Sequence, residues 1–431
     1  MINKRYIVSK KLGEGRSKVF NVIDTEFPDR EVAAKFLSSS ASIEEKEFFR
    51  EEFFILQKLD HPNIIKSFEL SSVLIKDEDE DFEIEKFSSF ITMEYFPPIP
   101  ILNYAGLKEE KKLNQIIKQI CSVLYYLHQS NYIYYDLKAE NILVSESNGN
   151  PIIKIIDLGF ARNVLSDYEK NIQGTAYYIA PELLKNEQHD FTVDFYSLGM
   201  LLYRIVYSKF PFSSDVELDI YKAHIEEEFV LGSSIYSKKL TNVISKLIKK
   251  NPEDRYKNAL QIILDLQLPI DFEVVKDLVP AKVFSDRKDA FNILSTYLKD
   301  KTSNEAFIVT GFDGSGKTSL LLEIFRQKQF SVYVENTKIK TGLEAVKYIF
   351  RKIILTETVY NERQQEYSEI INDVFDKSSK SFFESVKRIF NTLPSGVNLT
   401  ILLDDYNLYD EFTKESLAEM IRIFQVKGIK I

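Results

Sequence analysis

Apolar positions in the first two thirds of the chain follow two spacings, which predict strands mixed with helices. Short apolar runs at Glu31–Leu37 and Ile152–Ile156 are typical of strands. Apolar residues spaced three and four apart predict amphipathic helices over 42–65 and Leu113–His128. A last helix is expected over 259–268, and it marks the end of a first domain, which we expect to cover residues 1–268.

Strands alternate with helices in the rest of the chain, after a linker over 269–282. A strand, a glycine-rich turn and an amphipathic helix are expected over 305–325, and further apolar strands over 330–336 and 398–403. Such alternation is typical of an α/β domain with a parallel sheet. We expect this second domain to cover residues 283–431.

The end of the chain predicts an unfinished sheet. A helix is expected over 410–425, and the residues GIKI then begin a strand that stops at Ile431. A parallel sheet normally continues through further crossover connections, and an exposed unfinished edge is a liability for a protein in solution. We therefore expect these 431 residues to be a fragment of a longer polypeptide.

Composition and charge narrow the classes of function. Hydrophobic residues make up 44% and charged residues 28% of the chain, and 431 residues suffice for two or three domains. The formal net charge of −9 argues against nucleic acid as a main partner. Apolar runs stay short of twenty residues and the N-terminus lacks a signal-peptide core, so no membrane insertion is expected. The single cysteine, Cys121, suits a reducing cytoplasm.

Four polar residues interrupt the apolar pattern at spacings that suit phosphoryl transfer. Asp136, Lys138 and Asn141 share one short loop, and Asp157 follows the run Ile152–Ile156. This chemistry needs a carboxylate that orients the attacking hydroxyl, an amide and a carboxylate that hold magnesium, and a lysine that neutralises charge on the transferred group. One such residue alone is better explained by a polar turn, whereas all of them in register favour the catalytic interpretation.

Upstream residues add a predicted phosphate-binding turn. Gly13 and Gly15 precede a strand-like segment around Lys35, and glycines let backbone N–H groups approach phosphates whose oxygens a lysine can reach. Glu52 lies on the helix expected over 42–65, where it suits a partner that holds Lys35 in place. Each feature alone is more often a hairpin turn, a surface lysine or a surface glutamate.

With these motifs in order, residues 6 to about 266 resemble a eukaryotic-type protein kinase domain. The resemblance implies an α+β bilobal fold, with a small lobe over about 1–95 and a large lobe over about 96–268. It also implies that ATP and Mg²⁺ are the cofactors.

The resemblance assigns roles by position. Asp136 would be the catalytic base, and Lys138 would neutralise the γ-phosphate. Lys35 would contact the α- and β-phosphates, held by Glu52. The implied catalytic residues are Asp136, Lys138, Lys35 and Glu52, the implied magnesium ligands are Asn141 and Asp157, and the implied nucleotide-binding residues are Leu12, Gly13, Gly15, Val19, Ala33, Lys35, Met93, Glu94, Tyr95 and Leu143.

Other positions match the large lobe of the same family. The segment GTAYYIAPE resembles the substrate-docking loop, and Thr175 within it, together with Lys138, is the pattern of serine/threonine kinases. Arg255 stands where the family places the buried partner of Glu182, and Asp194 matches the aspartate that braces the catalytic loop. We expect structural roles for these last three residues.

The sequence also departs from the family pattern. The glycine loop is one residue short and lacks its third glycine, and Tyr134 and Tyr135 replace the usual His-Arg before the catalytic aspartate. Tyr135 removes the arginine that a phosphorylated activation loop would neutralise. We therefore hypothesise that activity does not depend on phosphorylation of Ser166, Tyr168 or Thr175.

A second set of residues predicts another nucleotide site. Gly311, Gly316, Lys317 and Thr318 complete the P-loop pattern G-x-x-x-x-G-K-[ST], with Gly314 in the same turn. Backbone amides and a helix N-terminus cradle the phosphates in such a loop, while Lys317 reaches the β/γ oxygens and Thr318 ligates magnesium.

An acidic pair, Asp404 and Asp405, ends the strand expected over 398–403. Without the P-loop this pair would be a plain loop start. In the resemblance to P-loop ATPases, Asp404 would hold magnesium through water and Asp405 would orient the attacking water. Two aspartates here resemble the signal-transducing class, whose members act as nucleotide-dependent switches.

The sequence thus predicts a cytoplasmic serine/threonine protein kinase fused to a P-loop NTPase switch domain. Protein substrates and further C-terminal sensor or output domains are the expected partners, because longer proteins that resemble this arrangement carry such domains. One alternative is a pseudokinase scaffold in which only the P-loop domain binds ATP productively. Another makes the second domain the only enzyme, an ATPase beside a protein-docking kinase fold.

Overall fold

The computed structural model describes most of the N-terminal part of the chain and short segments of the rest. The described residues are 1–15, 17–74, 84–97, 99–163, 175–212, 214, 216–269, 288–299, 309, 317, 320–321, 324, 331–334, 400–403 and 410–426. The chain divides into two compact units. Unit 1 is formed by Met1–Lys46, Ser67–Met93 and Lys282–Ile431, and unit 2 by Glu47–Lys66 and Glu94–Ala281.

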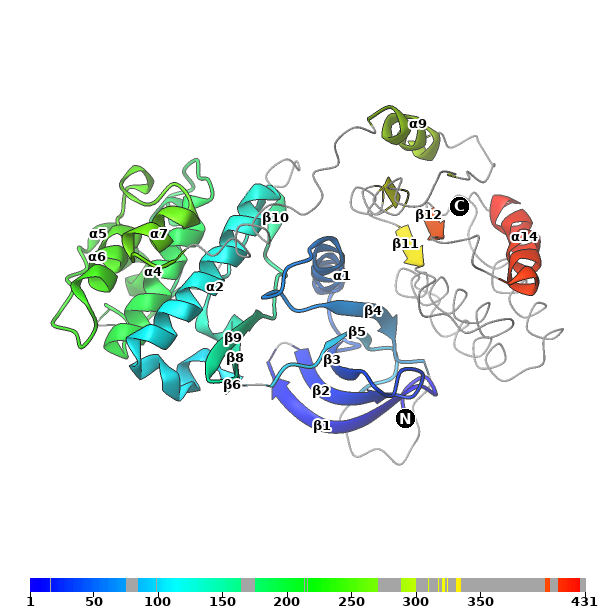
Figure 1. The fold of residues 1–431 in the computed structure, drawn as a ribbon, viewed down its shortest axis with the longest axis horizontal. Coiled ribbons are helices and arrows are strands. Elements are labelled where there is room, and N and C mark those ends of the chain that lie inside the picture. Colours follow the sequence, from blue (N-terminus) through cyan, green and yellow to red (C-terminus); the bar gives the residue numbers. More distant parts are fainter. Residues whose placement is uncertain are drawn as a thin grey trace. The chain divides into compact units, whose positions relative to one another are not determined.

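Unit 1 contains a five-stranded sheet, drawn in blue in Figure 1. Its strands are β1 (Tyr6–Glu14), β2 (Ser17–Asp24), β3 (Glu31–Leu37), β4 (Ser67–Ser72) and β5 (Ser89–Glu94), in the spatial order β1-β2-β3-β5-β4. The pairs β1–β2, β2–β3 and β4–β5 are antiparallel. The strand predicted at Glu31–Leu37 is therefore confirmed as β3.

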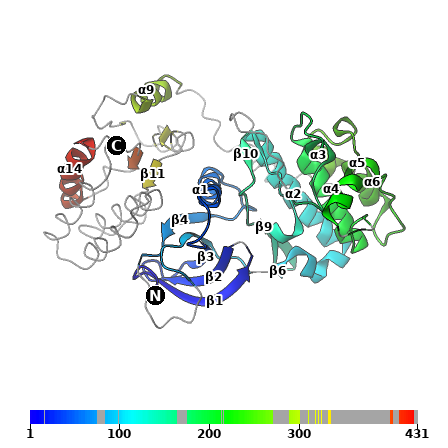
Figure 2. The same ribbon diagram turned by 180° about the vertical axis from the view of Figure 1, so that it is seen from behind.

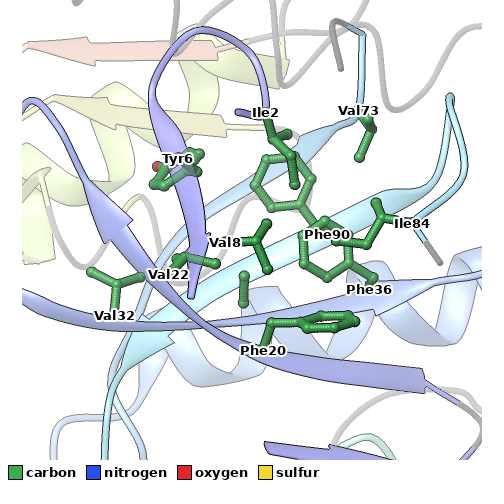
Figure 3. Close-up of a cluster of buried hydrophobic side chains, with 11 residues drawn as sticks. Ile2, Tyr6, Val8, Phe20, Val22, Val32, Phe36, Val73, Ile84 and Phe90 are labelled. Carbon is green, nitrogen blue, oxygen red and sulfur yellow. The ribbon is translucent and has the colours of Figure 1, made fainter. Parts of the chain in front are cut away.

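One face of this sheet carries an aromatic and β-branched core (Figure 3). Phe20 and Val22 of β2 and Val32 and Phe36 of β3 belong to it, because alternate residues of a strand lie on the same face. The rings of Phe36 and Phe90 stack with their centroids 5.1 Å apart. Lys35 lies on the opposite face of β3 and is half-buried.

The chain before β1 is anchored to this sheet by apolar and ionic contacts. Ile2 is fully buried in the core, and Arg5 is 5% exposed. Nε and Nη2 of Arg5 donate to the two carboxylate oxygens of Asp24 at 2.8 and 2.7 Å, and Nη1 donates to Oε2 of Glu69 at 2.8 Å. These charge-assisted hydrogen bonds join the N-terminus to β2 and β4. No pattern in the sequence predicted this cluster.

Unit 2 is mainly helical. Its longer helices are α1 (Ile43–Lys58, in this unit from Glu47 on), α2 (Glu110–Gln129), α4 (Thr192–Tyr207), α5 (Glu217–Glu226), α6 (Lys238–Leu247) and α7 (Ala259–Asp265), with the short α3 (Pro181–Leu184). Figures 1 and 2 show α4, α5, α6 and α7 grouped beside α2. The helix predicted over Leu113–His128 is confirmed as α2, and the helix predicted over 42–65 is present as α1 but ends at Lys58, so residues 59–65 are not helical. No helix among the described residues is both long enough and apolar enough to cross a bilayer.

Close packing in unit 2 depends on one glycine of α4. A Cβ added at Gly199 would lie 2.7 Å from Cβ of Leu247 and from Cγ2 of Ile248. Glycine therefore lets α4 approach the end of α6 directly. Cys121 of α2 is fully buried, as expected of a small core residue.

Short strands in unit 2 frame the loops that carry the predicted catalytic residues. β6 (Ile99–Pro100), β8 (Ile142–Ser147) and β9 (Asn150–Ile155) form one antiparallel sheet, and β7 (Tyr132–Ile133) pairs with β10 (Arg162–Asn163). The N–H of Ile155 donates to the carbonyl of Asn63 at 2.8 Å, and Ile65 donates back to Ile155 at 2.9 Å. These bonds fix β9 against the segment that follows α1.

The C-terminal segments of unit 1 include α9 (Lys288–Lys299), β11 (Ser331–Val334), β12 (Thr400–Leu403) and α14 (Glu411–Val426). β11 and β12 pair in parallel, and Leu294, Leu320, Ile324 and Leu402 form a buried cluster. The strands expected over 330–336 and 398–403 and the helix expected over 410–425 are thus present. The linker from residue 270 on and the final GIKI lie outside the described residues.

The antiparallel sheet of unit 1 and the helices of unit 2 agree with the α+β class expected for residues 1–268. The domain boundaries drawn from the sequence, at 268 and 283, stay predictions.

Candidate active site

The loop over 134–141 connects β7 to β8 and carries three of the predicted catalytic residues. Leu137 is fully buried and anchors the loop, which ends in a 3₁₀ turn at Ala139–Asn141. The N–H of Ile156 donates to the carbonyl of Asn141 at 3.0 Å. This bond ties the loop to the segment that carries Asp157.

Asp136 is the centre of a hydrogen-bond network in this loop. Its carboxylate accepts from Nζ of Lys138 at 2.6 Å, from Oγ1 of Thr175 at 2.8 Å and from Nδ2 of Asn141 at 3.0 Å. Lys138 also donates to Oγ1 of Thr175 at 3.0 Å. The structure therefore brings together four residues that the sequence analysis selected, and it fixes the orientation of the carboxylate of Asp136.

Asp194 holds the backbone of the same loop. It is fully buried, its Oδ2 accepts from the N–H of Tyr134 at 2.9 Å, and its Oδ1 accepts from the N–H of Tyr135 at 2.8 Å. Nε2 of His128 lies 2.8 Å from Oδ2. The predicted bracing contact is therefore present, and His128 is a further partner that the sequence analysis did not select.

Asp157 follows β9 in a tight turn. Its Oδ1 accepts from the N–H of Gly159 at 2.9 Å, and a Cβ added at Gly159 would lie 3.2 Å from this oxygen and 3.8 Å from Oε2 of Glu52. Glu52 is buried on α1, with only 3% exposed. The structure therefore brings Glu52 and Asp157 to the same turn.

Asn141 and Asp157 suit a magnesium ion by their chemistry. Nδ2 of Asn141 donates to the carbonyl oxygen and to the carboxylate of Asp136, so Oδ1 is the atom that suits a cation. Mg²⁺ prefers oxygen ligands and is usually held by one or two protein side chains together with phosphate oxygens and water. No group of three or more His, Cys, Asp and Glu residues in the described part of the chain forms a metal cluster. This pair of residues therefore fits a magnesium ion shared with a phosphate ligand.

Three predicted nucleotide-binding residues of unit 1 are aligned across its sheet. Gly13 of β1 pairs with Val19 of β2, and Val19 pairs with Lys35 of β3. Ala33 lies two residues before Lys35 on the same strand and so on the same face. The N–H of Gly15 donates to the carbonyl of Ser17 at 3.1 Å, which closes the glycine turn.

The remaining predicted nucleotide-binding residues lie in both units. Met93 of β5 is 5% exposed, and Leu12, Tyr95 and Leu143 are half-buried. Oε1 of Glu94 accepts from the N–H of Lys66 at 2.8 Å and from Nζ of Lys154 at 2.6 Å. The expected pairing of Lys35 with Glu52 joins residues of different units and stays a prediction.

A buried ion pair stabilises the segment after Thr175. Nη1 and Nη2 of Arg255 donate to the two carboxylate oxygens of Glu182 at 2.6 and 2.8 Å, with both side chains at most 1% exposed. The predicted contact between these two residues is confirmed, and it anchors the start of α3.

The contact between Tyr135 of this loop and His189 was not predicted from the sequence. The hydroxyl of Tyr135 lies 2.9 Å from Nε2 of His189, and burial raises the pKa of Tyr135 to about 12. The two residues are 54 positions apart, so no local spacing could indicate that they meet.

The second predicted nucleotide site has little described geometry. Lys317 is half-buried at a helical position that precedes Leu320 and Ile324 of the C-terminal apolar cluster. The other residues of that site lie outside the described residues, namely Gly311, Gly314, Gly316, Thr318, Asp404 and Asp405.

Comparison with known proteins gives a family match over the region that contains the Asp136 network. The family model described as "Protein kinase domain" matches residues 6–265. Calcium-dependent protein kinase 5 of Plasmodium berghei is 35% identical over 196 residues, which cover 44% of this chain and 33% of that protein. Serine/threonine-protein kinase PknB of Mycobacterium tuberculosis is 29% identical over 279 residues, which cover 62% of this chain and 43% of that protein.

A third relative aligns over more of the chain. The probable serine/threonine-protein kinase MARK-C of Dictyostelium discoideum is 28% identical over 354 residues, which cover 78% of this chain and 43% of that protein. The chain thus spans between 33% and 43% of the length of these three curated relatives.

Proposed function

The chain belongs to the protein kinase family, and from this premise we propose that it transfers the γ-phosphate of ATP to serine and threonine hydroxyl groups of proteins. The cofactors predicted from the sequence, ATP and Mg²⁺, are those that this family uses. The observation that carries the proposal is the network in which Lys138, Thr175 and Asn141 all donate to the carboxylate of Asp136.

In the proposed reaction, Asp136 orients the acceptor hydroxyl. The hydroxyl oxygen bonds to the γ-phosphorus, its proton passes to the carboxylate, and the bond from the γ-phosphorus to the bridging oxygen of ADP breaks. Nζ of Lys138 lies 2.6 Å from Asp136 and supplies positive charge beside the transferred group. Asn141 and Asp157 would hold Mg²⁺, which neutralises phosphate charge when bound.

The residues of unit 1 would bind the nucleotide itself. The aligned row of Gly13, Val19 and Lys35 supports this role, because it places a glycine, an apolar side chain and a lysine on adjacent strands. Backbone N–H groups of the glycine turn would approach the phosphates, and Lys35 would reach their oxygens.

Serine and threonine acceptors are favoured by the contact between Lys138 and Thr175. Their side chains lie 3.0 Å apart, and both bond the carboxylate of Asp136. The names of two of the relatives, serine/threonine-protein kinases, support the same acceptor class.

The test of this function is transfer of labelled γ-phosphate from MgATP to the chain itself and to a generic basic protein. Wild type, Asp157→Ala and Lys317→Ala are compared, with Glu253→Ala as the matched control, since its carboxylate is exposed and lies in unit 2. We expect Asp157→Ala to lose at least about a hundredfold in rate. We expect the two other variants to keep the wild-type rate.

The same experiment distinguishes the scaffold alternatives. If wild type transferred no phosphate while ATP turnover depended on Lys317, the kinase fold would be a docking module and the second domain the working enzyme. That result would overturn the proposed function.

We further propose that residues 283–431 form a nucleotide-binding P-loop switch domain. The parallel pairing of β11 with β12 supports this, as does the contact cluster in which Leu320 and Ile324 pack with Leu402 of β12. Equilibrium titration with a labelled ATP analogue tests it: we expect two sites in wild type and one in Lys317→Ala. A single site in both proteins would contradict the second site.

A further inference from the structure

Tyr135 and His189 join two segments of unit 2 that are distant in sequence. The Tyr135 hydroxyl lies 2.9 Å from Nε2 of His189, and the two rings meet edge to face with centroids 5.7 Å apart. Tyr135 directly precedes Asp136, whereas His189 lies in the segment between α3 and α4. Both side chains are half-buried, so the contact is partly shielded from water.

The hydrogen-bond pattern assigns a donor and an acceptor to this contact. Nδ1 of His189 lies 3.2 Å from the carbonyl oxygen of Glu187, which can only accept. Nδ1 therefore carries the proton, and in a neutral imidazole Nε2 is then an acceptor. The Tyr135 hydroxyl donates to it. With the imidazole in this tautomer, the contact needs no bound anion.

The backbone of Tyr135 is held separately from its side chain. Its N–H donates to Oδ1 of Asp194 at 2.8 Å, and its φ of 64° lies in the left-handed region that a bulky side chain seldom adopts. A strained residue keeps such a conformation only where its surroundings hold it. Asp194 holds one end of Tyr135 and His189 holds the other.

We propose that Tyr135 and His189 are positioning residues, whose hydrogen bond keeps the loop in the conformation that presents Asp136. This inference rests on the proposed function. An arginine at position 135 would need a phosphate group to balance its charge, whereas the tyrosine hydroxyl has a hydrogen-bond partner within the fold. The contact therefore gives a physical basis for catalysis without phosphorylation of the activation loop.

The test measures kcat and the KM for ATP in phosphoryl transfer for a set of variants. Tyr135→Phe removes only the donor, His189→Leu removes the acceptor, and His189→Gln replaces it with an amide oxygen. The matched control is Tyr236→Phe, because Tyr236 is also half-buried in unit 2 and its hydroxyl donates a single 2.8 Å bond, to the carbonyl of Leu107. Thermal unfolding of each variant checks that it is folded.

We expect Tyr135→Phe and His189→Leu each to lower kcat about three- to tenfold, with the KM for ATP within about twofold of wild type. The double variant should be no slower than either single variant, because both remove the same bond. His189→Gln should recover at least about half of the wild-type kcat, and Tyr236→Phe should match wild type. Phosphatase treatment of wild type should leave kcat unchanged.

Three results would each overturn the inference while leaving the proposed function intact. The first is transfer by Tyr135→Phe at the wild-type kcat, and the second is a double variant whose loss is the product of the two single losses. The third is a wild-type kcat that phosphatase treatment abolishes. No transfer by wild type at all would overturn the proposed function, and this inference with it.

Discussion

Thr175 donates a hydrogen bond from Oγ1 to Oδ1 of Asp136 at 2.8 Å, although the two residues are 39 positions apart. A residue from the segment before α3 thereby orients the proposed catalytic base. The hydroxyl proton of Thr175 is used in this bond, and a phosphate there would place negative charge beside a carboxylate. The contact therefore agrees with the hypothesis that activity does not require phosphorylation of Thr175.

Replacement of Thr175 tests this contact. Thr175→Ala removes a hydrogen bond to a carboxylate, so we expect kcat to fall about ten- to hundredfold. Thr175→Ser keeps the hydroxyl and should stay within about threefold of wild type. Steady-state kinetics with a fixed protein substrate give both values, and an unchanged kcat in Thr175→Ala would show that the bond does not orient Asp136 during catalysis.

Stability of unit 2 should depend strongly on Arg255. Arg255→Met leaves the carboxylate of Glu182, whose side chain is 1% exposed, without its partner. We expect the free energy of unfolding to fall by about 3–5 kcal/mol in urea denaturation. Arg255→Lys should also destabilise, because an ammonium group cannot form the two parallel bonds that the guanidinium makes.

The matched control for Arg255 is an exposed ion pair. Lys257 lies 2.8 Å from Glu253, with side chains 45% and 76% exposed. Lys257→Met should therefore change the free energy of unfolding by no more than about 0.5 kcal/mol. Equal effects at the two positions would mean that burial does not decide the strength of these pairs.

His61 should make the stability of unit 2 sensitive to acid. Burial, with a smaller contribution from the charge of Lys154, lowers the pKa of His61 from 6.5 to about 4. The N–H of Asn63 donates to Nδ1 at 3.0 Å, and Oγ of Ser122 lies 3.0 Å from Nε2, so the ring is held in its neutral form.

The sign of the effect follows from where the proton binds. His61 binds a proton near pH 6.5 in the unfolded chain but only near pH 4 in the folded chain. The stabilisation that neutral His61 gives the folded state is therefore complete above pH 6.5 and is lost as the pH falls from 6.5 to 4. The loss amounts to about 3 kcal/mol at pH 4. Between pH 7 and pH 5, the free energy of unfolding measured by urea denaturation should fall by about 2 kcal/mol less in His61→Gln than in wild type. Identical pH dependence in the two proteins would contradict this account.

The grouping of the candidate site residues in unit 2 was largely predictable, because short spacings along the chain indicate it. Asp136, Lys138 and Asn141 fall within six residues, and Asp157 directly follows an apolar run that predicts a strand. The strand at Glu31–Leu37 and the amphipathic helix that carries Glu52 were equally visible. Local patterns sufficed wherever residues act within one element or one turn.

Contacts between distant segments were not predictable in the same way. Arg5 meets Asp24 and Glu69 across 19 and 64 positions, and buried charges follow no periodic pattern. The tyrosine–histidine contact at position 135 was missed for the same reason. The sequence shows that Tyr135 stands where the family pattern has an arginine. It does not show which residue Tyr135 contacts instead, because that depends on the fold of the segment after α3.

The most direct test of the central claim compares phosphoryl transfer and ATP binding in Asp136→Asn and wild type. Asparagine keeps the size of the side chain but cannot accept the hydroxyl proton as a carboxylate does. We expect kcat to fall by about two to four orders of magnitude, while the Kd for ATP measured by calorimetry stays within about threefold of wild type. Transfer by Asp136→Asn at the wild-type rate would show that the chemistry does not use this carboxylate and would contradict the account.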